Sequence, residues 1–478
     1  MNIFLSLLAC ASLGACVAAP KIRPPAVTLP PVYTAGDPAM GAAALDCWWL
    51  AYNDQQLTDL VGRALGQGFS VREAFTRLQE AQAIRSGALA GFGLQGSLAV
   101  SGEAQRTQQL NGGVDIDIPG LPPSLSGGNN TTKSASVTFP VSWEVDLIGR
   151  RAATRRVAAA DLVAARFDYE GMRAATAAEI ARSLFQARGL AIQIDDARAS
   201  ANIQYRLLDL LTQRADRGLA PRSEVDRVEA DLAQAEALVA ELTAALDASR
   251  RSLLVLVGAG TQSVSMLVVT ATISAPPAIP AGLPGELLLR RPDVREAEAR
   301  LQAAIGNVRL DELAFFPRLS LRPTGALSYT AGDFGGLQAI AGLTAGLTTP
   351  LFDRKRLHAQ LGASSARAEG ALLAYERTVQ TAYSEADQAL IRLAADRARI
   401  ARLETGAAAA ERSYAAALRR FELGFSDLQT VLDAEQVVRG ARTALTTARL
   451  EEMQRSVQAF QALGGGWDMS VPEADFRG

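Results

Sequence analysis

The sequence GRRAATRRVAAADLVAARFDYEGMRAATAAEIARSLFQARGLAIQ begins at residue 149 and belongs to a run without proline that continues to residue 217. As one helix, this run would extend ~100 Å at about 1.5 Å per residue, which is several times the width of a globular domain. A second run of the same kind covers residues 353–423. The runs end in similar glycine turns, RGLAP and LGFSD. Two such rods predict a protein that crosses a distance.

Both runs are rich in alanine and poor in large apolar residues. Alanine favours the helix and lets neighbouring helices approach closely, but it buries little surface per residue. We therefore expect these rods to pack against other helices, including helices from other copies of the chain.

The composition excludes several classes of function. The 478 residues carry a formal net charge of -2, so nothing suggests binding to nucleic acid. The only histidine is His358, and no cysteine pair has the spacing of metal ligands. No Ser/His/Asp set or phosphate-binding loop occurs either. We therefore predict a protein that is not an enzyme and that holds no metal or cofactor.

The N-terminus, MNIFLSLLACASLGAC, predicts an export signal. Its apolar part has the length of a signal-peptide core and is too short to span a bilayer as a helix. Residues 13–16, LGAC, resemble a lipobox, which predicts a signal peptide at 1–15 and acylation of Cys16; Cys10 is the alternative site. A plain cleaved signal peptide is the other interpretation. Cleavage removes Cys10 and acylation blocks the thiol of Cys16, so Cys47 has no partner for an internal disulfide and we expect a small buried side chain there.

Two segments recur along the chain. VREAFTRLQEA at 71–81 matches VREAEARLQAA at 294–304 in eight of eleven positions, at an offset of 223. The two glycine turns are offset by 206. This pattern predicts a tandem duplication with about seventeen extra residues in the first half, for which the Gly-, Pro- and Asn-rich segment 111–130 is the obvious place.

Four segments alternate apolar and polar residues as β-strands do. They cover about 92–106 and 134–146 in the first half and about 317–330 and 337–351 in the second. Their length and alternation suit strands that cross a membrane, although a small soluble sandwich is the alternative. Four strands cannot close a barrel, and lipid does not tolerate an open sheet edge. We therefore predict a trimer with a twelve-stranded barrel, continued by a tube of helices.

The helices that follow the turns carry a seven-residue apolar repeat, which predicts left-handed coiled coils. The proline-rich segment between the halves predicts a strap outside the tube. The predicted layout is an extended segment at 16–44, a first repeat at 45–262, a linker at 263–283, a second repeat at 284–466 and a tail at 467–478. The long helices of the first repeat are predicted at 149–217 and 221–258, and those of the second at 353–423 and 427–463.

Five motifs resemble one known family along essentially the whole mature chain. They are FPVSWEVDLIGRRAAT from residue 139, LPGELLLRRPDVREAEARLQAA from 283, AFFPRLSLRPTGALS from 314, TTPLFDRKRL from 348 and ALGGGW from 462. In this order they resemble bacterial outer membrane factors, the TolC-like channels of the NodT lipoprotein group.

The resemblance implies a lipid-anchored trimeric duct in the outer membrane that extends into the periplasm. It also implies a periplasmic adaptor and an inner-membrane pump of the resistance-nodulation-division type as partners in drug, metal or small-solute efflux. A channel for type I protein secretion is the alternative within transport. A periplasmic coiled-coil scaffold without a pore is the alternative outside it.

Family members narrow their periplasmic end with acidic rings and ties between helices. The resemblance therefore implies aperture candidates near the two glycine turns, although a helix cap or a solvated surface charge explains each of them equally well. The carboxylate candidates are Asp427, Asp433, Asp226 and Glu224. The arginine candidates, which would tie neighbouring helices, are Arg214, Arg217, Arg419 and Arg420.

Overall fold

The computed structural model describes residues 23–35, 45–107, 130–280, 282–331 and 335–467. The described chain forms two compact units. The first unit contains the segments 82–161 and 301–370, and the second contains 24–81, 162–300 and 371–478. The predicted signal peptide, both candidate acylation cysteines and nearly all of the segment 111–130 lie outside the described residues.

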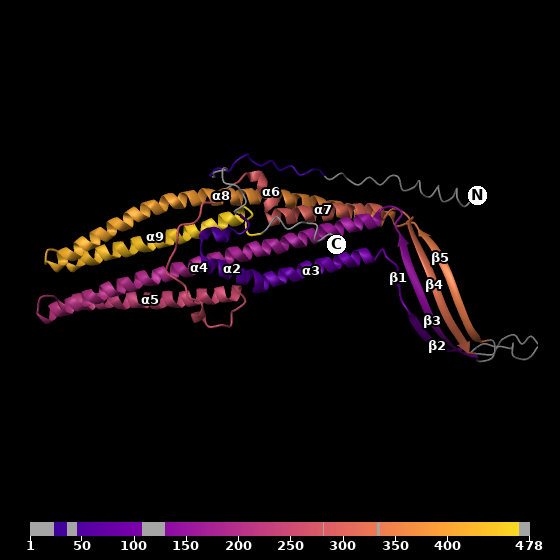
Figure 1. The fold of residues 1–478 in the computed structure, drawn as a ribbon, viewed down its shortest axis with the longest axis horizontal. Coiled ribbons are helices and arrows are strands. Elements are labelled where there is room, and N and C mark those ends of the chain that lie inside the picture. The colour runs from indigo at the N-terminus through magenta and orange to yellow at the C-terminus, as the bar shows by residue number, and fades with distance from the viewer. Residues whose placement is uncertain (1–22, 36–44, 108–129, 281, 332–334, 468–478) are drawn as a thin grey trace, which may run out of the picture. The chain divides into compact units, whose positions relative to one another are not determined.

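The first unit is built on an antiparallel sheet (Figure 1). Its strands are β1 (Gln95–Gly96), β2 (Ala99–Thr107), β3 (Asn130–Val145), β4 (Arg318–Ala331) and β5 (Gly336–Thr348). Strand β3 pairs with both β1 and β2 on one side and with β4 on the other, and β4 pairs with β5. Within the described residues, β2 and β5 each pair on one side only, so both are sheet edges.

The register separates an apolar face from a polar face. Val100 lies opposite Val137, and Val137 lies opposite Leu327. These side chains are 74%, 39% and 45% exposed. Because neighbouring strands put paired residues on the same face, the sheet has one apolar face that no described residue of this chain covers. The next row is polar, since Ser101 pairs with Ser136.

A proline explains why the strand expected at 92–106 is broken. The backbone of Pro140, which lies opposite the gap between β1 and β2, has no N–H to donate. The pairing between β1 and β3 has the same register as that between β2 and β3, with Ser97 donating to the carbonyl oxygen of Pro140 at the break. The strand is therefore one predicted element with a local gap.

The second unit contains most of each long helix and most of the core. The expected helices correspond to α4 (Arg150–Asp216), α5 (Arg222–Leu256), α8 (Arg354–Glu422) and α9 (Leu428–Ala462). The fully buried rings of Trp48, Phe185 and Phe460 form the centre of the largest apolar cluster. In α5, the apolar repeat is buried at Val225 and Val228, as the coiled-coil pattern predicts. A mainly helical chain with a small sheet is confirmed.

The element order occurs twice. Helix α3 (Phe69–Ala90) and helix α7 (Pro292–Leu313) both have 22 residues. The long helices α4 and α8 have 67 and 69 residues, and α5 and α9 have 35 each. This agreement in length accompanies the sequence repeat.

Two local expectations are wrong. The sequence of residues 46–65 predicts one short amphipathic helix, but a 3-10 turn, η3 (Trp48–Tyr52), ends at Asn53 with φ 50 before α2 (Gln55–Gln67) begins. Asp54 caps α2 by accepting a hydrogen bond from the N–H of Leu57, which is why the helix begins there. Cys47 is exposed rather than buried, because the tryptophans beside it take the core positions.

None of the helices in the described part of the chain is both long enough and apolar enough to span a bilayer.

Candidate functional site

The two glycine turns have the same hydrogen bonds. Gly218 and Gly424 have φ values of 70 and 79, which favour glycine because a Cβ is strained there. Leu219 donates its N–H to the carbonyl of Arg214 at 2.8 Å, and Phe425 donates to the carbonyl of Arg420 at 2.8 Å. These bonds satisfy carbonyl groups at the ends of α4 and α8. The sequence therefore set both turns locally, with glycine at the position that needs it.

An apolar cluster lies under the turns and joins the two helix pairs. It contains Leu207 and Leu211 from α4, Val228 from α5, and Phe421 and Val431 from α8 and α9. The guanidinium of Arg214 stacks over the ring of Phe421, 4.7 Å from its centroid. Of the predicted arginine candidates, Arg214 is thus the one that contacts the other helix pair, through a cation–π contact rather than a salt bridge.

Asp427 is the N-cap of α9. Its Oδ1 accepts a hydrogen bond from the N–H of Thr430 at 2.9 Å and another from the Thr430 hydroxyl at 2.6 Å. These two bonds favour the charged carboxylate and hold the pKa of Asp427 below its usual range. The corresponding residue before α5 is Pro221, which offers no side-chain cap. The side-chain cap after the glycine turn is therefore present in the second half of the chain and absent from the first.

Asp433 belongs to a tie between α5 and α9 that sequence reasoning missed. Gln429 donates from Nε2 to Oδ1 of Asp433 at 2.6 Å, and its Oε1 accepts from Arg227 at 2.6 Å. Arg227 lies on α5, so the amide of Gln429 links the two helices. The signal in the sequence was only a glutamine four residues before an aspartate, which is common on exposed helix faces.

The remaining candidates are not brought together. Within the described residues, no side-chain hydrogen bond or ion pair connects any of them to another candidate. Glu224 lies in the first turn of α5 and is half-buried. The other four are exposed: Asp226, Arg217, Arg419 and Arg420.

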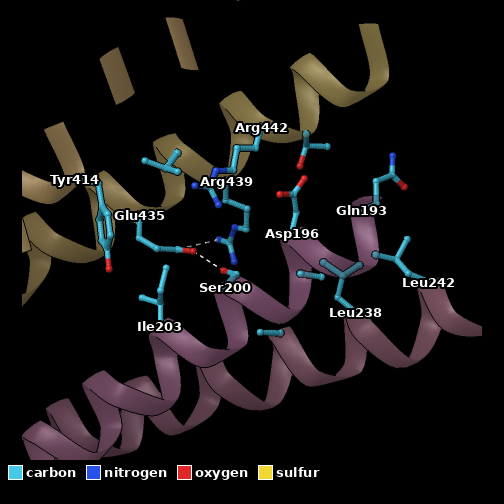
Figure 2. A pocket seen from close by; sticks show the side chains of 14 residues that line it. Gln193, Asp196, Ser200, Ile203, Leu238, Leu242, Tyr414, Glu435, Arg439 and Arg442 are labelled. Carbon is cyan, nitrogen blue, oxygen red and sulfur yellow. Dashed lines mark hydrogen bonds and ion pairs between the residues drawn. The ribbon is translucent and has the colours of Figure 1, made fainter. Parts of the chain in front are cut away.

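A pocket of ≈ 190 Å³ opens between α4, α5, α8 and α9 (Figure 2). Its apolar wall includes Leu238 and Leu242. Glu435 is only 4% exposed and accepts a short hydrogen bond from the hydroxyl of Ser200 on α4. Figure 2 shows Glu435 pointing toward Ser200 and toward Arg439, whose Nη2 lies 3.9 Å away. A buried carboxylate thus ties α9 to α4, a feature that periodicity alone did not reveal.

Around this pocket, charges are compensated within the helix pairs. Arg442 on α9 bonds to Glu411 on α8 at 2.9 Å. Burial raises the pKa of Asp196, against the attraction of Arg442. Burial, and next the charge of Glu435, likewise raise the pKa of Tyr414. In the described part of the chain, no group of three or more potential ligands is placed to hold a metal ion.

Helices α8 and α9 are also joined by ion pairs along their length. The pairs are Arg397 with Glu452, Arg399 with Glu451, Arg442 with Glu411, Arg449 with Glu404 and Arg455 with Asp396. Each exposed pair contributes little, but five in sequence fix the register of the two helices. The arrangement supports a rigid helical wall rather than a reaction centre.

The model of one protein family, described as outer membrane efflux protein, matches residues 60–259 and 283–465. The chain belongs to this family. The resemblance carried by the five motifs is therefore confirmed, together with the outer-membrane location and the efflux function. Outer membrane efflux proteins are channels, and membership in this family indicates no enzymatic activity.

Relatives of this outer membrane efflux protein match over most of their length. The pyoverdine export outer membrane protein OpmQ of Pseudomonas aeruginosa is 29% identical, over 97% of both chains. The toluene efflux pump outer membrane protein TtgF of Pseudomonas putida is 26% identical, over 88% of this chain and 85% of the relative. The structure of the outer-membrane channel OprN is 27% identical and has a TM-score of 0.79, covering 95% of this chain and 100% of that chain.

Proposed function

We propose that three copies of this chain assemble into a duct whose twelve strands close a barrel in the outer membrane. The observation that carries the proposal is the sheet of one copy, in which β2 and β5 each pair on one side only within the described residues. An open edge in lipid leaves backbone N–H and C=O groups without partners, at a cost of several kcal/mol each. Edge-to-edge pairing of β2 with β5 of the next copy removes that cost.

The exposed apolar face supports the same assembly. It carries Val100, Phe139, Leu327 and Leu343, all more than a third exposed. Side chains of this kind suit contact with lipid, while the serine and threonine rows on the other face suit a water-filled bore. Twelve strands fall within the range of known membrane barrels. Symmetric closure also brings the long helices of three copies together into a tube.

The proposed duct is passive and takes its solutes from an inner-membrane pump of the resistance-nodulation-division type through a periplasmic adaptor. Two of its relatives are named for pyoverdine export and for toluene efflux, which supports small organic solutes as cargo. The compensated ion pairs of the helical wall suit a conduit, since they hold helices in register.

We also propose that the N-terminus is anchored by lipid, at Cys16 or at Cys10. The described segment that follows is held along α8. The N–H of Ala26 donates to Glu376 at 2.9 Å, and the N–H of Thr34 donates to Asp387 at 2.7 Å. The ring of Tyr33 stacks on Tyr383 with centroids 5.9 Å apart. A segment tied in this way would keep a lipidated end at a defined place.

The two halves of each copy would stem from a tandem duplication.

The periplasmic aperture is proposed at the two glycine turns, with the eight candidate residues around it. The test is planar-bilayer conductance of the purified trimer. If the carboxylates set the aperture, Asp433→Ala and Asp427→Ala will change the conductance or the preference for cations. Asp427→Asn is the matched control, since it keeps a capping oxygen and removes the charge.

An Asp427→Asn trimer with altered selectivity would assign the effect to the charge, and one that behaves like the wild type would assign it to the cap. An unaltered current in all three variants would remove the aperture assignment. A purified trimer that conducts no ions would overturn the duct itself.

A further inference from the structure

Four charged side chains lie on the polar face of the described sheet, and three of them gather near the start of β4. The register places Glu144 opposite Ser320, with Arg318 and Arg322 two positions to either side of that serine. Alternation puts all three on the same face as Ser136 and Ser328. The fourth charged residue, Glu103, pairs with Ser134 toward the other end of the strands.

The carboxylates near these two arginines are already engaged. Glu144 attracts Arg318, but it is shared with Arg150 at the start of α4, whose Nη1 lies 3.8 Å away. Asp353, which lines a shallow pocket together with Arg318, lies 3.3 Å from Arg356. No ion pair joins Arg318 or Arg322 to a carboxylate within the described residues. The sheet thus carries an excess of positive charge at this level.

The two guanidinium groups are also accessible. Both Arg318 and Arg322 are exposed. Each lies opposite a threonine of β5, and neither is paired with a described residue of β3. Nothing in the pairing of β4 with β5 covers them, since Arg318 lies opposite Thr348 and Arg322 opposite Thr344. A solute on this face of the sheet would therefore meet the charges directly.

We propose that Arg318 and Arg322 of the three copies form a ring of guanidinium groups that lines the bore beside the strand ends and favours anionic solutes. This proposal rests on the trimeric duct proposed above, in which the polar face is the inner face. A ring of arginines or lysines is the arrangement by which pores favour anions. Guanidinium also binds carboxylate and phosphate groups in a bidentate manner, so the solutes favoured are those that carry such groups.

The strength of the effect depends on salt. The screening length is ~30 Å at 0.01 M and ~10 Å at 0.1 M ionic strength. Charges on the wall of a wide bore therefore act across it only in dilute salt. Solutes that pass close to the wall feel the ring at both concentrations.

The test measures the reversal potential of the reconstituted full-length trimer in a dilute potassium chloride gradient. Wild type is compared with the double variant Arg318→Gln and Arg322→Gln. We expect the ratio of chloride to potassium permeability to fall by roughly twofold or more in the double variant. Lys133→Gln is the matched control, because the register puts Lys133, opposite Ala331, in the row of the apolar face. It should leave the ratio unchanged.

A second measurement uses citrate as the probe. Citrate added to the wild-type trimer should reduce the chloride current, and the double variant should lose this block while keeping its heat-modifiable trimer band. An unchanged permeability ratio in a conducting double variant, or equal block by citrate, would overturn the ring. Absence of conductance in the wild type would instead overturn the duct, so the two failures are distinguishable.

Discussion

The apolar face of the sheet makes a sharp prediction about two neighbouring residues of β3. Val137 lies near the middle of this strand, seven residues from Asn130 and eight from Val145. It belongs to the apolar row with Val100 and Leu327. Ser136 belongs to the polar row and bonds to the hydroxyl of Ser101 at 2.8 Å. If the apolar face meets lipid, an arginine should be tolerated at 136 and not at 137.

The magnitude follows from the position along the strand. At about 3.3 Å per residue, a strand as long as β3 extends ~50 Å, which a tilt of about 40° reduces to ~40 Å across the membrane. The apolar band of a barrel is about 25 Å tall, so mid-strand Val137 lies near its midplane. An arginine there costs ~2–4 kcal/mol per chain, or roughly 30- to 700-fold in the equilibrium for membrane assembly. Three chains multiply the effect.

The assay compares Val137→Arg with Ser136→Arg after expression of each full-length chain. The yield of heat-modifiable trimer in the outer-membrane fraction is measured against wild type. We expect little or no trimer from Val137→Arg and near wild-type yield from Ser136→Arg. Equal yields from the two variants would refute the assignment of the faces, and with it the argument for a barrel.

Two further predictions concern the helical unit. Arg291 is 9% exposed and pairs with Asp293 at 2.7 Å and with Glu385 at 2.8 Å. The substitution Arg291→Met should therefore lower the free energy of unfolding by about 1.5–3 kcal/mol. An unchanged urea midpoint, measured by circular dichroism, would contradict this. The pKa of Asp427 is lowered in the folded chain. Its charged cap therefore stabilises α9 fully at a pH above the ordinary aspartate pKa of ~3.9. This stabilisation is lost as the pH falls through the lower pKa of the folded chain. Hydrogen-exchange protection of the Thr430 amide, relative to that in Asp427→Asn, should decrease over this acidic window, and a constant ratio would show that the charge contributes nothing.

Several family motifs owe their place to packing that no local pattern reveals. The carbonyl of Arg290 accepts a hydrogen bond from Trp467 at 2.8 Å, and Arg291 donates to the carbonyl of Ala462 at 3.2 Å. Gly464, with φ 80, lies against the backbone of Arg290 with no room for a Cβ. The segments LLLRRPD and ALGGGW are far apart in the sequence, so only the folded chain explains why both need these residues.

The sequence by itself determined the long helices, the two turns and the faces of the sheet, because each depends on residues close together in the chain. Alternation assigned Val137 and Ser136 to opposite faces, and Gly218 and Gly424 marked the turns. The N-cap role of Asp427 was also readable, since its partner is three residues away.

Only the tertiary structure decided which side chains from different helices meet. The buried contact of Ser200 with Glu435 and the link from Arg227 through Gln429 join residues more than 200 positions apart. Periodicity places a residue on a face of its own helix, but the neighbour on that face is set by how whole helices pack. Alternation alone puts Arg318 and Arg322 on one face, but only the strand register places Glu144 beside them, where Arg150 already pairs with it.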